Sequence, residues 1–394
     1  MSAPLPLEEA QARILALAKP LAIERVDVAS ALGRFTSEPL IARRCQPAAD
    51  ASAMDGYAVR GPDLAGPWAV IGESAAGHSF DGTVGAGEAV RISTGAKLPD
   101  GADTVIVQED VAREGSALRL TGTPPSPAGK HIRRRASDFG DTAELLAVGA
   151  HLGPAQLALA LSAGHSHIAV RRMPRLTVID SGDELAADPE NCPAHQTPAS
   201  NGAMLAAMAS ALPCTVRRDG PVADDIAALV AAFERAAGAD LIVTSGGASV
   251  GDHDLIRPAL EAWRAKIDFW RIAIKPGKPL LVARKADTIV LGLPGNPVSS
   301  YVTAFHFMLP LLRALAGSTA PIVRPVMLPL AAPMAAGGER REFLRGRLTA
   351  GGIEPLLRQD SGALAALSQA QVLIDRAAKA PAHGAGEQVP VYLL

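Results

Sequence analysis

Cysteine and aromatic residues are scarce in this sequence. Its 394 residues include three cysteines, Cys45, Cys192 and Cys214, which are widely spaced and form no CxxC pair. This number and spacing argue against a disulfide framework and against a zinc ribbon, and we expect a cytoplasmic protein. Aromatic residues make up 4% of the chain. Small modules with so few large apolar side chains bury little surface alone, which favours a homodimer.

The sequence also lacks an excess of charge of either sign and lacks long hydrophobic runs. Its 38 basic and 40 acidic residues leave a formal net charge of −2, which is too small for the strong field that non-specific nucleic-acid binding needs. No run approaches the roughly eighteen apolar residues of a membrane span, and Glu8 and Glu9 stand where a signal peptide would be basic. We therefore expect neither a nucleic acid nor a membrane as a partner.

The local pattern changes several times along the chain and predicts a multidomain protein with α/β and β parts. Short β-type runs separated by Gly, Pro and Asp between about 67 and 130 are typical of an all-β module. Strand-like and helix-like segments then alternate, which predicts parallel βαβ units, and the last part returns to the short strands of a barrel or sandwich. We place a two-segment linker domain at 1–45 and 141–173, a β-rich domain at 46–140, an α/β domain at 174–320, and a C-terminal β-barrel domain at 321–394.

Three loops of the α/β part follow predicted strands, at the edge where such sheets bind ligands. The loop "TSGGASVGDHD" at 244–254 combines glycines, whose N–H groups can surround an anion, with carboxylates that would repel one unless a cation intervened. A phosphate with its metal would satisfy both features, whereas the simpler alternative is a glycine turn with an acidic helix cap. In "DSGDEL" at 180–185, Glu184 would point into the same crevice as Asp254, which predicts a divalent-cation site. Alternatively, Asp183 and Glu184 are a helix N-terminal pair.

Two further segments of this part predict anion binding. A Pro-Gly turn in "IAIKPGKPLL" holds Lys275 and Lys278 close together, and an oxyanion would relieve their repulsion; the alternative is two solvated lysines in a hairpin. In "GLPGNPVSS" at 292–300, Pro297 suits the first turn of a helix whose free N–H groups could face a phosphate. The segment matches neither GxGxxG nor the P-loop pattern, so we do not expect an ordinary dinucleotide.

Other polar clusters lie outside the α/β part. The segment "DASAMDGYA" carries Asp50, Ser52 and Asp55, and "RRRASD" sets three arginines beside Asp138. A basic triplet is usually a solvated face, although Arg also pairs well with phosphate. The segment "REFLRGRL" near the C-terminus is best interpreted as an edge strand protected by its charges.

Taken together, the motifs resemble the molybdopterin molybdenumtransferases of molybdenum-cofactor synthesis, to which the E domain of gephyrin is related. The resemblance covers nearly the whole chain and rests on seven segments in order: "DASAMDGYAVRG", "RISTGAKLPDGADTVIVQED", "RRRASDFG", "SGDEL", "TSGGASVGDHD", "FWRIAIKPGKPL" and "GLPGNPVSS". It implies an L-shaped homodimer of four-domain subunits with a molybdopterin-binding α/β domain and an active site at the dimer cleft. The implied reaction inserts molybdate into adenylylated molybdopterin, releases AMP and depends on Mg²⁺.

The resemblance also implies roles for individual residues. The catalytic set would be Asp55, Asp138, Asp224, Asp254, Lys275 and Lys278. Glu184 and Asp254 would hold the metal. The substrate-binding set would be Thr94, Ser245, Gly246, Gly247, Ser249, Arg271, Pro294, Gly295, Asn296, Pro297, Arg345 and Ser368, of which the last two rest on a weaker match. Partners would include a molybdopterin adenylyltransferase and molybdoenzymes or cofactor-maturation proteins.

The chain departs from the family at two places. Arg271 stands where the family usually has lysine, which replaces a point donor by a planar fork. Ala199 stands where an acid usually precedes Ser-Asn, beside an atypical insert at 186–200 whose Cys192 and His195 we do not interpret as a metal site. Two other functions stay open: a gephyrin-like dimeric scaffold without catalysis, and a hydrolase that releases AMP without needing molybdate. The largely intact carboxylate and lysine set favours the transferase.

Overall fold

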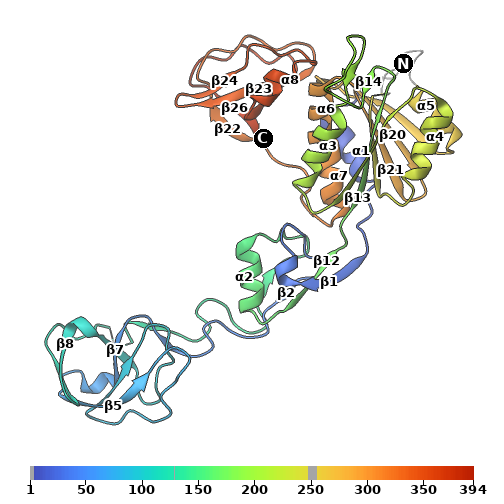
Figure 1. The fold of residues 1–394 in the computed structure, drawn as a ribbon. Helices are drawn as coiled ribbons and strands as arrows, with labels where there is room; N and C mark the ends of the chain where they lie inside the picture. The colour runs from blue at the N-terminus through green and yellow to red at the C-terminus, as the bar shows by residue number, and fades with distance from the viewer. Residues whose placement is uncertain (1–3, 128, 247–254) are drawn as a thin grey trace.

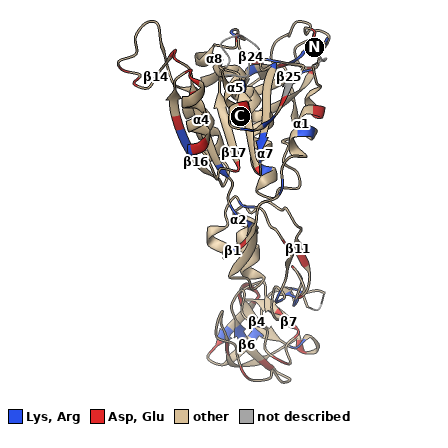
Figure 2. Cartoon of the chain, turned by 90° about the vertical axis from the view of Figure 1, so that its right-hand side faces the viewer, with Lys and Arg blue, Asp and Glu red and all other residues tan. Residues whose placement is uncertain are grey.

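The computed structural model describes residues 4–127, 129–246 and 255–394. They form an elongated molecule, with the β-rich domain at one end, a narrow linker domain in the middle, and the α/β domain and C-terminal strands at the other end (Figure 1). The predicted multidomain architecture of α/β and β parts is confirmed. Basic and acidic residues are interspersed along the chain (Figure 2), in keeping with a formal net charge of −2.

A six-stranded sheet with the order β16, β13, β17, β21, β20, β18 forms the centre of the α/β domain. Its strands are β13 (Arg175–Ser181), β16 (Thr215–Val222), β17 (Leu241–Ser245), β18 (Lys266–Arg271), β20 (Pro279–Lys285) and β21 (Thr288–Leu293). The first four in spatial order are parallel, as predicted. The expectation was wrong for the other two, since β20 and β18 pair antiparallel to their neighbours. The connection from β20 to β21 is a short turn, which can join only antiparallel strands.

Helices cover both faces of this sheet (Figure 1). Successive residues of a strand point to opposite faces, so Val178 packs in one core cluster with α3 (Asn201–Ser210), whereas Ile179 packs in the other with α4 (Ile226–Arg235) and α5 (Ile256–Ala262). The N-terminal helix α1 (Leu7–Leu15) joins the first cluster through Leu7, Ala10 and Ile14. By its packing α1 is therefore part of the α/β domain, although the sequence pattern led us to place it with the linker segment.

The first cluster also contains a continuous helical run, Pro297–Leu315. It consists of α6 (Pro297–Thr303), a π-helical turn (Ala304–Met308) and α7 (Leu309–Leu315). Contrary to the expectation from sequence, this run of 19 residues is long and apolar enough to cross a membrane by length and composition alone. However, 78% of its most apolar window is buried inside the structure, as in the core helix of a globular domain.

The C-terminal strands form a closed barrel. A sheet with the order β19, β23, β25, β26, β22 continues through β24, which pairs with β23, and a bridge between Leu330 and Ile353 closes it. The elements are β19 (Ile274–Lys275), β22 (Val326–Pro329), β23 (Arg341–Thr349), β24 (Gly352–Pro355), α8 (Leu364–Ser368), β25 (Val372–Arg376) and β26 (Gln388–Leu393). Because β19 comes from the α/β domain, this strand joins the two domains edge to edge.

The other two domains are smaller. In the β-rich domain a six-stranded sheet has the order β7, β4, β6, β5, β9, β8, and β3 pairs with β10 beside it. Its strands are β3 (Ala51–Ser52), β4 (Gly56–Val59), β5 (Trp68–Ser74), β6 (Glu88–Ile92), β7 (Thr104–Val107), β8 (Val111–Glu114), β9 (Ala117–Leu120) and β10 (Ile132–Arg133). The linker domain pairs segments from both sides of this module: β1 (Ile23–Asp27) with β12 (His167–Arg171), and β2 (Leu40–Ile41) with β11 (Glu144–Leu146), next to α2 (Pro154–Ser162).

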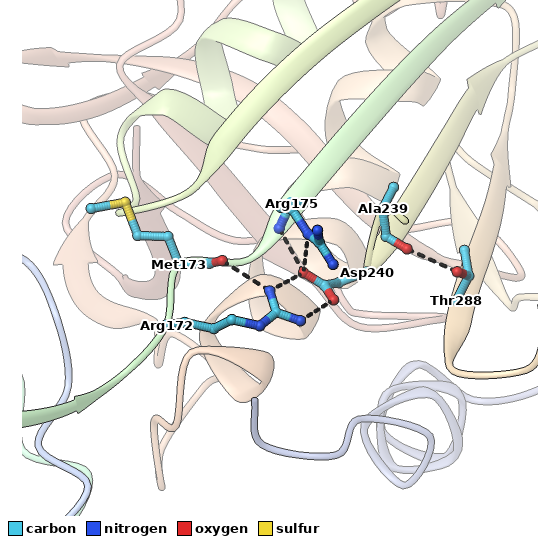
Figure 3. Close-up of polar contacts among 6 residues, drawn as sticks. All are labelled: Arg172, Met173, Arg175, Ala239, Asp240 and Thr288. Carbon is cyan, nitrogen blue, oxygen red and sulfur yellow. Dashed lines mark hydrogen bonds and ion pairs between the residues drawn. The ribbon is translucent and has the colours of Figure 1, made fainter. Parts of the chain in front are cut away.

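One carboxylate fastens the linker domain to the α/β domain. Asp240 accepts two hydrogen bonds from the Arg172 guanidinium, at 2.7 and 2.6 Å, and one from the backbone N–H of Arg175 at 2.8 Å. Figure 3 shows that these groups surround the point where the chain passes from β12 into β13. The hydrogen bond with Asp240 raises the pKa of Arg172 above its usual value, so this guanidinium stays charged. We call this group the hinge clamp.

Candidate active site

Two adjoining clefts lie beyond the carboxyl ends of the parallel strands. The lysine cleft, of about 600 Å³, lies between the α/β domain and the barrel, and the described residues lining it include Lys275, Lys278 and Arg340. The strand-end cleft, of about 630 Å³, lies over the ends of β13 and β17. Both clefts are lined by Glu184, Gly246, Gly295 and Asn296, so they meet there.

The lysine cleft is built on the turn between Lys275 and Lys278. Gly277 has φ +103°, and a Cβ at this position would lie 2.7 Å from Thr303 Cγ2, so only glycine fits between the turn and α6. The backbone N–H of Ile272 donates to the carbonyl of Lys278 at 2.7 Å, which closes the turn. Both lysine side chains are exposed at the cleft, so the structure brings these two predicted cations together.

Lys275 also has a partner that the sequence did not reveal. Its ammonium group donates to Glu342 at 3.1 Å, and Glu342 is 4% exposed and also bonded to Arg376. Burial alone would raise the pKa of Glu342, but the hydrogen bonds from Arg376 and Lys275 outweigh it and lower this pKa below its usual value. This carboxylate, held ionised in the barrel, thus fixes one predicted anion-binding lysine of the neighbouring domain.

The predicted "GLPGNPVSS" loop also lies at this junction. Pro294 is buried after β21, and Gly295, Asn296 and Pro297 line the clefts. Asn201 donates to the carbonyl of Gly295 at 2.6 Å. One expectation needs correction: the Val298 N–H in the first turn of α6 donates to the carbonyl of Ser361 at 3.0 Å, so the barrel, rather than a phosphate, takes up this group.

Arg345 and Ser368 do not line either cleft in the described part of the chain. Arg345 is fully buried and donates at 3.0 Å to the carbonyls of Arg358 and Asp360. Burial lowers the pKa of its guanidinium. Arg345 therefore supports the loop that carries Asp360 and Ser361, two residues that line the lysine cleft. Ser368 is exposed on α8 and donates to the carbonyl of Ala365 at 2.9 Å.

The predicted acidic residues are divided between the two ends of the molecule. Glu184 lines both clefts. Asp224 lies beside Asp183, the residue before Glu184. The backbone N–H of Asp224 donates to the Asp183 carboxylate at 3.1 Å, and the backbone N–H of Asp183 donates to the Asp224 carboxylate at 3.3 Å. Asp55, between β3 and β4, and Asp138, after β10, belong by contrast to the β-rich domain, which lies at the other end of the molecule (Figure 1).

At the β-rich end, Asp55 accepts a hydrogen bond of 2.7 Å from the backbone N–H of Thr94. This bond lowers the pKa of the Asp55 carboxyl. The side chains of Asp55, Thr94 and Asp138 are all exposed. One subunit therefore does not bring this group to the clefts at its other end.

Three predicted residues, Gly247, Ser249 and Asp254, lie outside the described residues. Within the described ones, no three His, Cys, Asp or Glu side chains gather as a metal site. Ser245 is buried at the end of β17 and lines the strand-end cleft. Arg271 is partly exposed at the end of β18.

Sequence reasoning missed Asp180. This residue ends the apolar run of β13, is 3% exposed and lines the strand-end cleft. An acid at the end of a buried strand, just before a glycine turn, was the available signal. Ala199, where the resemblance led us to expect an acid, lines the same cleft.

Comparisons with known proteins cover nearly the whole chain. Family models for the MoeA N-terminal region (domain I and II), a probable molybdopterin binding domain and the MoeA C-terminal region (domain IV) match residues 5–164, 177–314 and 327–394. The chain is 36% identical to the molybdopterin molybdenumtransferase of Haemophilus influenzae over 317 residues, which are 79% of this chain and 78% of that protein. It is 34% identical to the Synechococcus elongatus molybdopterin molybdenumtransferase over 366 residues, 88% of this chain and 89% of that protein.

Solved structures show the same fold. A crystal structure of a molybdopterin biosynthesis MoeA protein from Pyrococcus horikoshii has a TM-score of 0.80 and 30% identity, with 99% of both chains covered. A second one, with a TM-score of 0.84 and 24% identity, covers 100% of both chains.

Proposed function

This chain belongs to the molybdopterin molybdenumtransferase family and is a transferase of molybdenum-cofactor biosynthesis, and from this premise we propose that it inserts molybdate into adenylylated molybdopterin with release of AMP. The observation that carries the proposal is the pair of exposed lysines, Lys275 and Lys278, in a cleft next to one whose described lining is neutral and acidic. Molybdate is a tetrahedral dianion and needs cationic donors, whereas a pterin ring is uncharged. The lysine cleft has the cationic donors that molybdate needs, and the described lining of the strand-end cleft has none.

In this proposal Lys275 and Lys278 bind the oxygens of molybdate. Hydrogen bonds from charged donors are shorter and stronger than neutral ones. The Glu342 carboxylate holds the ammonium group of Lys275 through a hydrogen bond of 3.1 Å. The backbone of Gly246 and Gly295, where the clefts meet, would lie along the phosphate linkage of the substrate.

We also propose Mg²⁺ as the metal of this site, held by Glu184 and Asp254. The fit rests on the donor chemistry, because Mg²⁺ prefers oxygen ligands and commonly uses one or two carboxylates together with substrate phosphates. Glu184 lies where the two clefts meet. When bound there, Mg²⁺ would stabilise negative charge on the phosphate that leaves with AMP.

A homodimer is the further part of the proposal. The exposed Asp55, Thr94 and Asp138 belong to the β-rich domain, whereas residues of the α/β domain and the barrel line the clefts. These parts lie at opposite ends of the elongated chain (Figure 1). A two-fold dimer would let the β-rich end of each subunit face the clefts of the other. We place the protein in the cytoplasm, with no membrane and no nucleic acid as partner, and expect encounters with a molybdopterin adenylyltransferase and with molybdoenzymes or cofactor-maturation proteins.

The test is to incubate the purified protein with adenylylated molybdopterin and Mg²⁺, with and without molybdate, and to follow free AMP and protein-bound molybdenum. AMP release that depends on both molybdate and Mg²⁺, with transfer of molybdenum to the pterin, supports the proposal. AMP release that is indifferent to molybdate would identify a hydrolase. No AMP release under any condition would favour the non-catalytic scaffold.

A further inference from the structure

Asp180 is a buried carboxylate with an unpaired oxygen at the strand-end cleft. It is the last residue but one of β13 and is 3% exposed, and it lines the cleft with Ser181 of the same strand. In the described part of the chain, no donor lies within hydrogen-bonding distance of its Oδ1 atom. A buried acceptor without a donor is costly, since the lost hydration is not replaced. Such a group is expected where a ligand supplies the missing donor.

The neighbours of Asp180 satisfy only its other oxygen. Arg218 approaches Oδ2 at 3.6 Å, which is a loose contact from a side chain that is 48% exposed. Gly202, in the first turn of α3, packs so closely that a Cβ there would lie 2.0 Å from Oδ2. Burial raises the pKa of Asp180 above its usual value, although the contacts with Gly202 and Arg218 act to lower it. One oxygen of the carboxylate is therefore contacted by Gly202 and Arg218, while the other has no partner among the described residues.

The walls of the strand-end cleft indicate what kind of donor it takes. Its described lining contains no lysine, arginine or histidine, and its neutral polar side chains include the hydroxyls of Thr197 and Ser200 and the amide of Asn201. The carboxylates in this lining are Asp180 and Glu184. An anion would be repelled here, whereas an uncharged heterocycle with N–H donors would be bound. The volume of about 630 Å³ is ample for a bicyclic ring.

We propose that Asp180 is a specificity-determining residue that accepts hydrogen bonds from the 2-amino and N3–H edge of the substrate's pterin ring. The choice of ring rests on the proposed function, because adenylylated molybdopterin carries both a pterin and an adenine. The pterin offers two adjacent donors on one edge, which the two lone pairs of the unpaired Oδ1 atom can accept together, while adenine offers its amino group next to an acceptor nitrogen that a carboxylate would repel. Asp180 thus recognises the pterin ring of the substrate by hydrogen bonding, while the lysine cleft binds molybdate.

The test compares two ligands that differ only at this edge. The probes are 6-hydroxymethylpterin and 6-hydroxymethyllumazine, in which a carbonyl replaces the 2-amino group, with AMP as a third ligand, and binding is followed by calorimetry on the full-length protein. The wild type is expected to bind the pterin about tenfold more tightly than the lumazine, as for one hydrogen bond to a charged acceptor. Asp180→Asn and Asp180→Ser are expected to reduce this preference to about twofold or less, with AMP binding unchanged. The matched control is Asp188→Asn, at an exposed carboxylate of the neighbouring 186–200 segment that accepts a hydrogen bond from Asn191, which should keep the full preference.

Each contrary outcome is distinct. A wild-type protein that does not prefer the pterin overturns the inference, and this measurement needs no variant to fold. Variants that keep the pterin preference, or that lose AMP binding instead, overturn it as well. The transferase assay is independent of these results: if molybdate insertion proceeds while the preference does not depend on Asp180, the inference fails and the proposed function stands. If insertion is absent while the preference depends on Asp180, the proposed function fails and the pterin site stands.

Discussion

Lys275 has two candidate roles in this structure, and one substitution separates them. Lys275 lines the lysine cleft, where we propose that it binds molybdate, and its ammonium group also donates to Glu342 at 3.1 Å. Replacing Lys275 by Gln keeps a side chain of similar length and removes the charge. If the lysine binds molybdate, the variant loses one charge-assisted hydrogen bond to the substrate, worth roughly 1.5–3 kcal/mol. The molybdate concentration at half-saturation should then rise about tenfold to a hundredfold.

The effect of the same substitution on folding should be small. The Lys275 side chain is 57% exposed, and pairs with this exposure contribute at most about 1 kcal/mol. After the substitution Glu342 keeps its bond to Arg376, so no carboxylate is left buried without a partner. Glu342→Gln is the useful contrast, because it removes the negative charge from between Lys275 and Arg376. This variant should destabilise the fold by about 3 kcal/mol, since the Arg376 side chain is only 11% exposed.

The assay measures initial rates of AMP release over a range of molybdate concentrations, together with thermal unfolding of each variant. Lys19→Gln serves as the control, because Lys19 is an exposed lysine that pairs with Asp287. It should leave both the half-saturation and the unfolding temperature unchanged. The reasoning is refuted if Lys275→Gln leaves the molybdate dependence intact and lowers stability as much as Glu342→Gln does. Lys275 would then be a structural partner of the barrel, and the oxyanion would have to bind near Arg340 or Arg271.

Three further predictions concern the metal, the hinge clamp and the dimer. Asp254→Asn should keep the fold and abolish Mg²⁺-dependent AMP release, because a neutral ligand binds a hard cation weakly; unchanged release would exclude this ligand. Asp240→Asn should destabilise the protein by about 2 kcal/mol in urea, because it weakens a partly buried charge pair with Arg172, whereas Asp287→Asn, at a carboxylate that is 89% exposed, should not. Sedimentation at micromolar concentration should find a dimer, and a species of about 40 kDa alone would contradict the proposed arrangement.

Much of the architecture could be predicted because local patterns carry it. The strands of the α/β sheet are short apolar runs bounded by glycine and acidic residues, and the loops after them are the loops that line the clefts. The lysine turn was predicted from Pro276 and Gly277 because a rigid turn needs few distant contacts. These features depend on residues that are close together in the sequence.

The features that could not be predicted depend on distant residues. Glu342 lies 67 residues from Lys275, and only the pairing of β19 with β23 brings the two together. The burial of Arg345 depends on the loop that contains Asp360, which folds over it. The attachment of α1 to the α/β core likewise depends on α7, at the far end of that domain. No periodicity within these segments encodes such contacts.

The hinge clamp also affects the arrangement of the two subunits in the proposed dimer. If the β-rich end of each subunit completes the clefts of the other, its position depends on the angle at which the linker domain leaves the α/β domain. That angle is set where β12 passes into β13, at the bonds between Asp240 and Arg172 (Figure 3). A loosened clamp would leave the lysine cleft of the same subunit intact, since its residues belong to the α/β domain and the barrel. Asp240→Asn should therefore reduce molybdate insertion while pterin binding at Asp180 persists, a separation that a site contained within one subunit would not show.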